Sequence, residues 1–187
     1  MKNKPKAIIV MKVGPHSGMS LVDIIVSKKE EEKIHGVHYW GYSGVFCQPK
    51  PTKDFCEWAK KNYGEEPYLI LIETKSSYKS DIGMITQYSE DNKTFEKFVS
   101  PVQLQGAQFS FVAKEIEMVK AFDLDDYIVV GGKNDGKILP QHLKYRVNKA
   151  FAKLKSRTEK ENDVGASETI SVLRAKLVYP YAIWLKE

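Results

Sequence analysis

The apolar residues of this chain are grouped into runs that have the length of a β-strand and not more. The most pronounced runs, Ala7 to Met11 and Tyr68 to Ile72, are bounded by charged residues or proline. Short runs of this kind fit strands that are buried on both faces, whereas a membrane-spanning helix needs about 20 apolar residues. We therefore expect a globular, sheet-containing protein that has no membrane partner.

A chain of 187 residues with 42% hydrophobic and 28% charged residues has the size and composition of one folded domain. We expect residues 1–187 to form a single compact domain. The charged start, Met1 to Lys6, is typical of a signal peptide, but the apolar stretch after it stops at Lys12. The cysteines Cys47 and Cys56 form no disulfide framework or metal pattern, and a cytoplasmic location with reduced thiols is the expectation.

Three segments have the pattern of a helix. The first begins with a capping box, in which Ser20 is followed by Asp23, and ends at Gly36. The second runs from Thr52, as the capping residue, to Gly64, and the third from Leu139 to Leu154. The apolar stripe of the third segment consists of Leu139, Leu143, Val147, Ala150, Phe151 and Leu154.

The other apolar segments have the length and residue types of strands, and Glu115 to Phe122 fits either a strand or a helix. The strand-like segments are Lys6–Val13, Val37–Tyr42, Glu66–Thr74, Met84–Tyr88, Thr94–Val99, Gln108–Ala113, Tyr127–Val130 and Thr169–Leu185. Their order and short spacing predict an α+β (mixed α/β) domain, which has a central, largely antiparallel sheet and about three helices.

The loop between the first strand and the first helix is a candidate anion site. A loop that leads from a strand into a helix directs backbone N–H groups and the positive end of the helix dipole toward one place. Here Ser17 and Ser20 would add hydroxyl donors, and Lys12 and His16 would add positive charge. The alternative is that Gly14 and Pro15 simply form the turn and that Ser20 simply caps the helix.

The second expected strand carries a row of ring-bearing side chains that alternate with other residues. His38, Trp40 and Tyr42 would share one face, and Ser43 follows them in a turn. Such a row can stack on a base and donate hydrogen bonds to a sugar or phosphate. The alternative is a half-buried strand whose aromatic rings pack beneath a helix.

The glycine-rich segment 131–138 has the spacing of a phosphate-binding P-loop, but its chemistry differs. Ile138 stands where a serine or threonine hydroxyl should bind magnesium, and Pro140 follows closely. We therefore predict a turn here and not a P-loop.

Positive charge is concentrated in one part of the sequence. Residues 133–160 contain seven lysines and two arginines but only two acidic residues, whereas the whole chain has a formal charge of +5. The polar face of the third expected helix is a candidate surface for a nucleic acid or an acidic protein, or else a solvated face. The candidate polyanion-binding residues are Lys133, Lys137, Lys144, Arg146, Lys149 and Lys153.

Catalytic patterns are sparse. The four histidines lack the spacing of a zinc site, and neither a metal nor a cofactor is expected. The residues that could carry acid–base chemistry are His16, His38, Glu73 and Lys75.

Three classes of function remain open. The leading hypothesis is a binding module, possibly sequestering, for a phosphate-bearing ligand, either a nucleotide-like small molecule or a nucleic acid. The second is a small hydrolase or nuclease-like enzyme that acts on a phosphodiester or nucleotide. The third is an interaction or inhibitor protein that docks on its partner through the basic helix.

Overall fold

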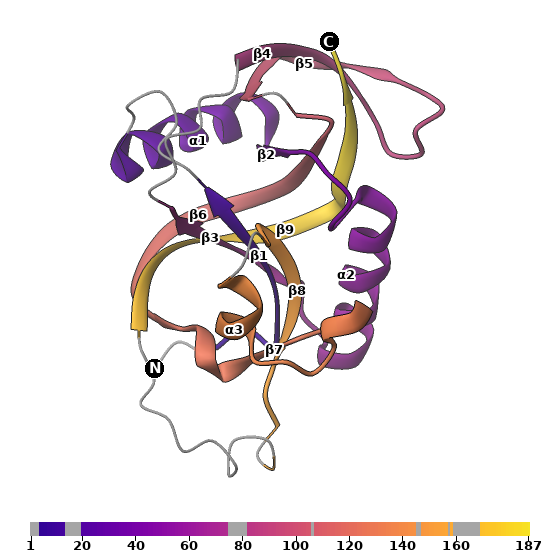
Figure 1. The fold of residues 1–187 in the computed structure, drawn as a ribbon. Coiled ribbons are helices and arrows are strands. Elements are labelled where there is room, and N and C mark those ends of the chain that lie inside the picture. Colours follow the sequence, from indigo (N-terminus) through magenta and orange to yellow (C-terminus); the bar gives the residue numbers. More distant parts are fainter. Residues whose placement is uncertain are drawn as a thin grey trace.

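The computed structural model of this chain describes residues 4–13, 20–74, 82–105, 107–144, 147–156, 158 and 169–187. Within these ranges the protein has a nine-stranded sheet and three α-helices (Figure 1). The only parallel pair of strands described is β1 with β3, so the α+β class with a largely antiparallel sheet is confirmed. No helix in these ranges has both the length and the apolar character needed to cross a bilayer.

The elements follow one another in this order along the chain: β1 (Ala7–Val13), α1 (Leu21–His35), β2 (His38–Tyr42), α2 (Pro49–Tyr63), β3 (Tyr68–Glu73), β4 (Ile82–Ser89), β5 (Glu96–Gln105), β6 (Phe109–Asp123), η1 (Leu124–Asp126), β7 (Tyr127–Val129), η2 (Gly132–Asn134), α3 (Leu139–Leu143), β8 (Lys149–Leu154) and β9 (Thr169–Lys186).

Seven of the nine strands follow the order β2-β6-β9-β3-β1-β8-β7, and β4 pairs with both β5 and β9 outside this path. The two longest strands, β6 and β9, lie side by side in this order. The first part of β6 pairs with β2 and with the end of β9, and the rest of β6 pairs with the start of β9. The register shifts between these parts, and Glu115 there has a positive φ of 59°. Irregularities of this kind bend a strand, and Figure 1 shows both strands curving across the molecule.

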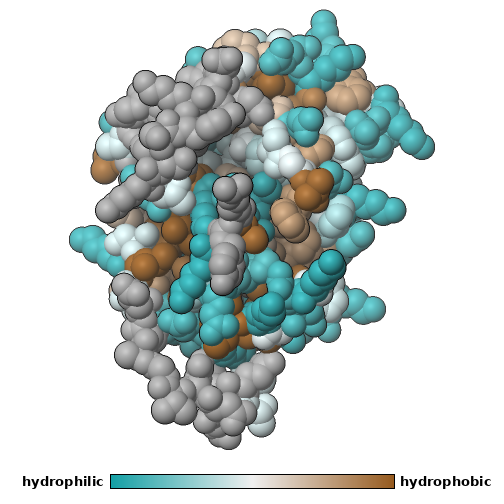
Figure 2. All heavy atoms as spheres, in the orientation of Figure 1, coloured by the Kyte–Doolittle hydropathy of each residue, from teal (hydrophilic) through white to brown (hydrophobic). Residues whose placement is uncertain are grey.

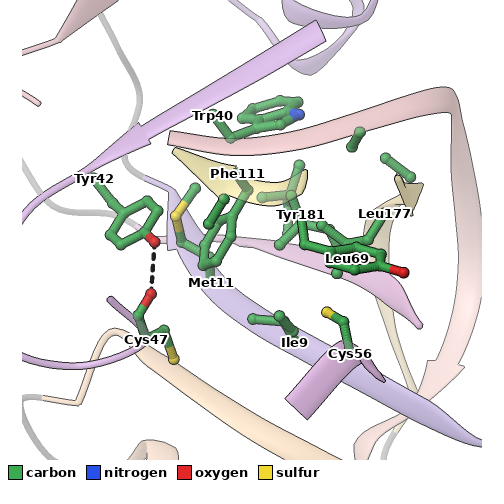
Figure 3. Close-up of a cluster of buried hydrophobic side chains, with 14 of the residues drawn as sticks. Ile9, Met11, Trp40, Tyr42, Cys47, Cys56, Leu69, Phe111, Leu177 and Tyr181 are labelled. Atoms are coloured by element: carbon green, nitrogen blue, oxygen red, sulfur yellow. Dashed lines mark hydrogen bonds between the residues drawn. The ribbon is translucent and has the colours of Figure 1, made fainter. Parts of the chain in front are cut away.

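The bend encloses the larger hydrophobic core. Side chains from one face of β1, from β2 and from β6 meet the buried side of α2 there (Figure 3). A second core lies on the opposite face of β1 and includes Ile8, Val10 and Leu139. Because β1 is covered on both faces, its continuous apolar run has the expected buried position.

Helix α1 covers the free edge of β2. Lys28 donates a hydrogen bond from Nζ to the carbonyl oxygen of Tyr39, and the backbone N–H of Tyr39 donates to the Glu31 carboxylate. Lys28 and Glu31 also form an ion pair of 3.2 Å. The backbone N–H and C=O groups of Tyr39 are therefore not available to another strand.

The expectation of one helix from Leu139 to Leu154 is wrong. Helix α3 ends at Leu143, and Lys149 to Leu154 form strand β8, which pairs with β1 on one side and β7 on the other. Ala150 and Ala152 are buried at alternate positions, which is the period of a strand. The long basic helix, through which an interaction or inhibitor protein would have docked on its partner, is therefore absent.

The start of α2 also differs from the expectation. The helix begins at Pro49, and its N-cap residue, Gln48, makes no side-chain capping bond. Thr52 lies within the first turn and donates its hydroxyl to the carbonyl oxygen of Cys47 at 2.7 Å. Proline at the first helical position fixes φ without loss of a helical hydrogen bond, so no capping side chain is needed.

The capping box of α1 has the predicted form. The backbone N–H of Asp23 donates to the Ser20 hydroxyl at 3.2 Å, and the backbone N–H of Ser20 donates to the Asp23 carboxylate at 3.1 Å. We expect Ser20→Ala to lower the free energy of unfolding by about 1 kcal/mol in urea denaturation. Ser27→Ala, an exposed change within α1, is the matched control and should cause no loss, because alanine has the higher helix propensity. Equal losses in both variants would contradict the capping role.

Candidate functional site

The predicted row of His38, Trp40 and Tyr42 lies inside the protein. These side chains are 0%, 5% and 6% exposed, respectively. The Trp40 indole donates from Nε1 to His38 Nδ1 at 2.9 Å, and Tyr42 stacks on Phe111 with ring centres 4.2 Å apart (Figure 3). The stacking surface expected from the sequence is therefore not open to a base, and the three rings contribute to packing.

His38 also lacks the properties of an acid–base catalyst. Burial, together with the nearby charge of Lys28, lowers the pKa of His38 from its usual 6.5 to about 3. Since Trp40 donates to Nδ1, the proton of the neutral ring is on Nε2, which has no hydrogen-bond partner in the described residues. The Glu32 carboxylate is 3.8 Å from this atom. At neutral pH the ring is uncharged and closed off from solvent.

Several other candidates are not brought together. Glu73 is exposed at the end of β3, where it lies opposite Val13 in the ladder with β1. The remaining candidates of the sequence analysis, His16, Ser17, Lys75 and Arg146, lie outside the described residues. Without His38, the proposed hydrolase has no acid–base group placed beside Glu73 in the part of the chain that is described.

Lys149 stands out as a buried cation at the end of the sheet where β1 finishes. It lies opposite Met11 in the ladder and is only 9% exposed. Its ammonium group donates to the carbonyl oxygen of Ser43 at 3.0 Å and lies 5.2 Å from the centre of the Tyr42 ring. Burial lowers the pKa of Lys149 below its ordinary value. Neither contact supplies a negative charge, and no described carboxylate forms an ion pair with this ammonium group.

The loop from Ser43 to Gln48, which joins β2 to α2, is held firmly beside Lys149. The Cys47 carbonyl oxygen accepts the Tyr42 hydroxyl at 2.6 Å and also the hydroxyl of Thr52. Cys47 is a buried free thiol, and burial raises its pKa to about 12, so it is a poor nucleophile. Val45 and Phe46 of the same loop are 78% and 54% exposed. The loop thus combines an anchored backbone with two exposed apolar side chains.

Further positive charge lies on the other face of β1, around α3. Lys12 donates from Nζ to the carbonyl oxygen of Leu143. Burial lowers the pKa of His142, and the charges of Lys137 and Lys12 lower it further. The effect on His142 indicates a positive electrostatic potential at this end of the sheet. Figure 2 shows mainly hydrophilic side chains over the lower front of the molecule, where α3 and β8 lie.

The other predicted polyanion-binding residues are dispersed among several elements. Lys133 lies in η2, Lys144 follows α3, and Lys153 is half-buried on β8, four residues after Lys149. These residues do not form the continuous basic face that a helix would have given. No group of three or more histidine, cysteine or acidic residues that could hold a metal ion occurs in the described ranges.

The special position of Lys149 was not evident from the sequence, because the surrounding residues fit a helix and placed Lys149 on its solvated face. The alternation of Lys149, Phe151 and Lys153 with small alanines was the available signal for a strand. No family model, no curated protein and no solved structure matches this chain.

Proposed function

We propose that this protein binds a small phosphate-bearing ligand of the nucleotide type, at the end of the sheet where Lys149 and the loop from Ser43 to Gln48 meet. The observation that carries the proposal is the buried ammonium group of Lys149, whose described partners are a carbonyl oxygen and an aromatic ring. A buried cation without an anionic partner is costly, and an anionic ligand would supply the missing charge.

The surroundings of Lys149 suit an organic phosphate better than an inorganic anion. Lys12 and Lys137 add positive potential on the opposite face of β1. Phe46 and Val45 provide exposed apolar surface on the loop whose first residue contacts Lys149. Apolar side chains beside a few charged donors are the usual composition of a small-ligand site. The parallel strands β1 and β3 also end here, and ligands of sheets with parallel strands often bind at such ends.

Binding can be tested by calorimetric titration of the purified protein with inorganic phosphate, AMP, ATP and short single-stranded DNA. In Lys149→Met the unbranched apolar stem is retained and the terminal ammonium group is lost. A charge-assisted hydrogen bond contributes about 1.5 to 3 kcal/mol, so we expect affinity for the nucleotide probe to fall about 10- to 100-fold. Lys153→Met is the control on the same strand and should change affinity less than about twofold.

Loss of binding must be separated from loss of folding. Removal of a buried charge without a carboxylate partner should leave the melting temperature of Lys149→Met unchanged or raise it. Tight binding of DNA with a steep salt dependence, and none of AMP or ATP, would indicate a nucleic-acid surface instead. If no phosphate-bearing probe binds, or if Lys149→Met binds like the wild type, the proposal is incorrect.

A further inference from the structure

A second candidate site lies away from Lys149, in a hollow of about 700 Å³ beside the second half of β6. The hollow is lined by residues of β6, by Arg174 of β9, by Tyr127 of β7 and by the chain at Lys4 and Pro5. A volume of this size is typical of sites for small organic molecules. No residue predicted from the sequence as functional lines it.

Arg174 is the most buried of the three cations that line this hollow, the others being Lys4 and Lys120, and it is held by several contacts. It is only 9% exposed. Its Nε donates to the Glu117 Oε1 atom at 3.0 Å, and Nη2 donates to the same oxygen. The guanidinium carbon also lies 5.3 Å from the centre of the Tyr68 ring. One edge of the guanidinium group is therefore occupied by Glu117, and one of its faces is covered by an aromatic ring.

The other edge of the guanidinium group remains available. A guanidinium group has five N–H donors, and those of Nη1 have no acceptor among the residues that the structure describes. An arginine can pair with two carboxylates at once, one on each edge, because its planar donors match the two oxygens of a carboxylate. Arg174 lines the hollow and thus has one edge available for a second anionic group.

The walls of the hollow determine what else its ligand carries. Met118 and Val119 provide its aliphatic surface, and behind them Phe122 and Tyr127, which are almost fully buried, stack with ring centres 5.5 Å apart. Glu117 and Asp123 also line the hollow, and Lys4 forms ion pairs with Asp123 and Asp126. The aliphatic surface favours an apolar body. The three cations of the lining, Lys4, Lys120 and Arg174, exceed its two acids, Glu117 and Asp123, by one charge, so one added anionic group balances them.

We infer that the hollow binds a small monocarboxylate with an aromatic or aliphatic body, whose carboxylate pairs with the free edge of Arg174. This site is independent of the phosphate site at Lys149. The two ligands differ in chemistry: the lining of the hollow carries one net positive charge, which a single carboxylate at the unoccupied guanidinium edge would balance, whereas the site at Lys149 is proposed to bind a phosphate.

The test uses two-dimensional amide NMR of the full chain, titrated with benzoate, phenylpropionate and octanoate, and with benzamide as the uncharged control. We expect shifts of the Lys120, Phe122 and Tyr127 signals with the acids, and at least tenfold weaker binding of benzamide than of benzoate. Lys149→Met should bind the acids like the wild type. Binding of the acids is expected even if the protein binds no phosphate-bearing ligand at Lys149.

Two substitutions should change the affinity in opposite directions. Arg174→Lys keeps the charge but loses the planar pair of donors, and should weaken carboxylate binding about tenfold or more. Glu117→Gln removes the competing carboxylate and should tighten binding several-fold, an effect that a misfolded variant would not produce. Equal binding of acid and amide, shifts confined to the Lys149 end of the sheet, or weaker binding in Glu117→Gln would each overturn the inference.

Discussion

Lowering the pH from about 7 to about 4.5 should reduce the free energy of unfolding by about 2 to 3 kcal/mol through His38 alone. In the folded protein the pKa of His38 is about 3, chiefly because of burial, whereas the unfolded chain has the ordinary value near 6.5. Between these values the unfolded state binds one more proton than the folded state. Stability is therefore complete above pH 6.5 and is lost as the pH falls toward 3.

The contribution of His38 can be isolated by comparing pH-dependent changes. His38→Asn retains an oxygen that can accept the Trp40 N–H bond but does not titrate in this range. Urea unfolding at both pH values measures how much free energy of unfolding each protein loses on acidification. The loss in the variant should be smaller than that in the wild type by about 2 to 3 kcal/mol, whatever the absolute stability of the variant. His142→Asn should give a smaller difference, because His142 is only partly buried. If wild type and His38→Asn lose equal stability on acidification, His38 is not the acid-sensitive group.

Phe111→Ala should destabilise the fold by about 3 to 5 kcal/mol. Phe111 is fully buried on β6, where its backbone pairs with Trp40 of β2 on one side and Ala182 of β9 on the other. Its ring stacks on Tyr42 within the core enclosed by the bent strands (Figure 3). Replacement by alanine removes this contact and leaves a cavity that rigid neighbours on two strands cannot close. Urea denaturation followed by circular dichroism measures the loss.

The same chemical change at an exposed position provides the control. Phe46 is 54% exposed, so Phe46→Ala should alter the free energy of unfolding by less than about 1 kcal/mol. If Phe46→Ala and Phe111→Ala lose similar stability, the described core around Phe111 is not the main source of stability.

Local sequence chemistry was sufficient to predict the elements that begin or end with strong signals. The capping box at Ser20 and the left-handed Gly36, with φ of 75°, determine α1. The apolar run of β1 indicated a strand covered on both faces, and it is one. These features depend on residues close together in sequence, so a pattern of a few residues contains the necessary information.

The errors concern features that only distant contacts determine. The segment from Lys149 to Leu154 fits both helical and strand periods, and pairing with β1 and β7 selects the strand. Alternation correctly placed His38 and Trp40 on one face of β2, but it cannot tell whether that face is open. Both faces of β2 are in fact covered, since His38 is 0% and Tyr39 is 8% exposed. For the same reason, the pairing of Arg174 with Glu117 has no local sequence signal.

The position of β1 in the sheet has a consequence for the rate of folding. Ile9 pairs with Leu69 on one side and with Phe151 on the other, so this strand is completed only when a segment near the far end of the sequence reaches it. Each such pairing requires closure of a long loop before any contact energy is gained. Folding on the millisecond-to-second scale typical of such topologies follows, rather than microseconds. Until β8 arrives, β1 remains an apolar strand with an unpaired edge, so the yield of refolding should fall as the protein concentration rises.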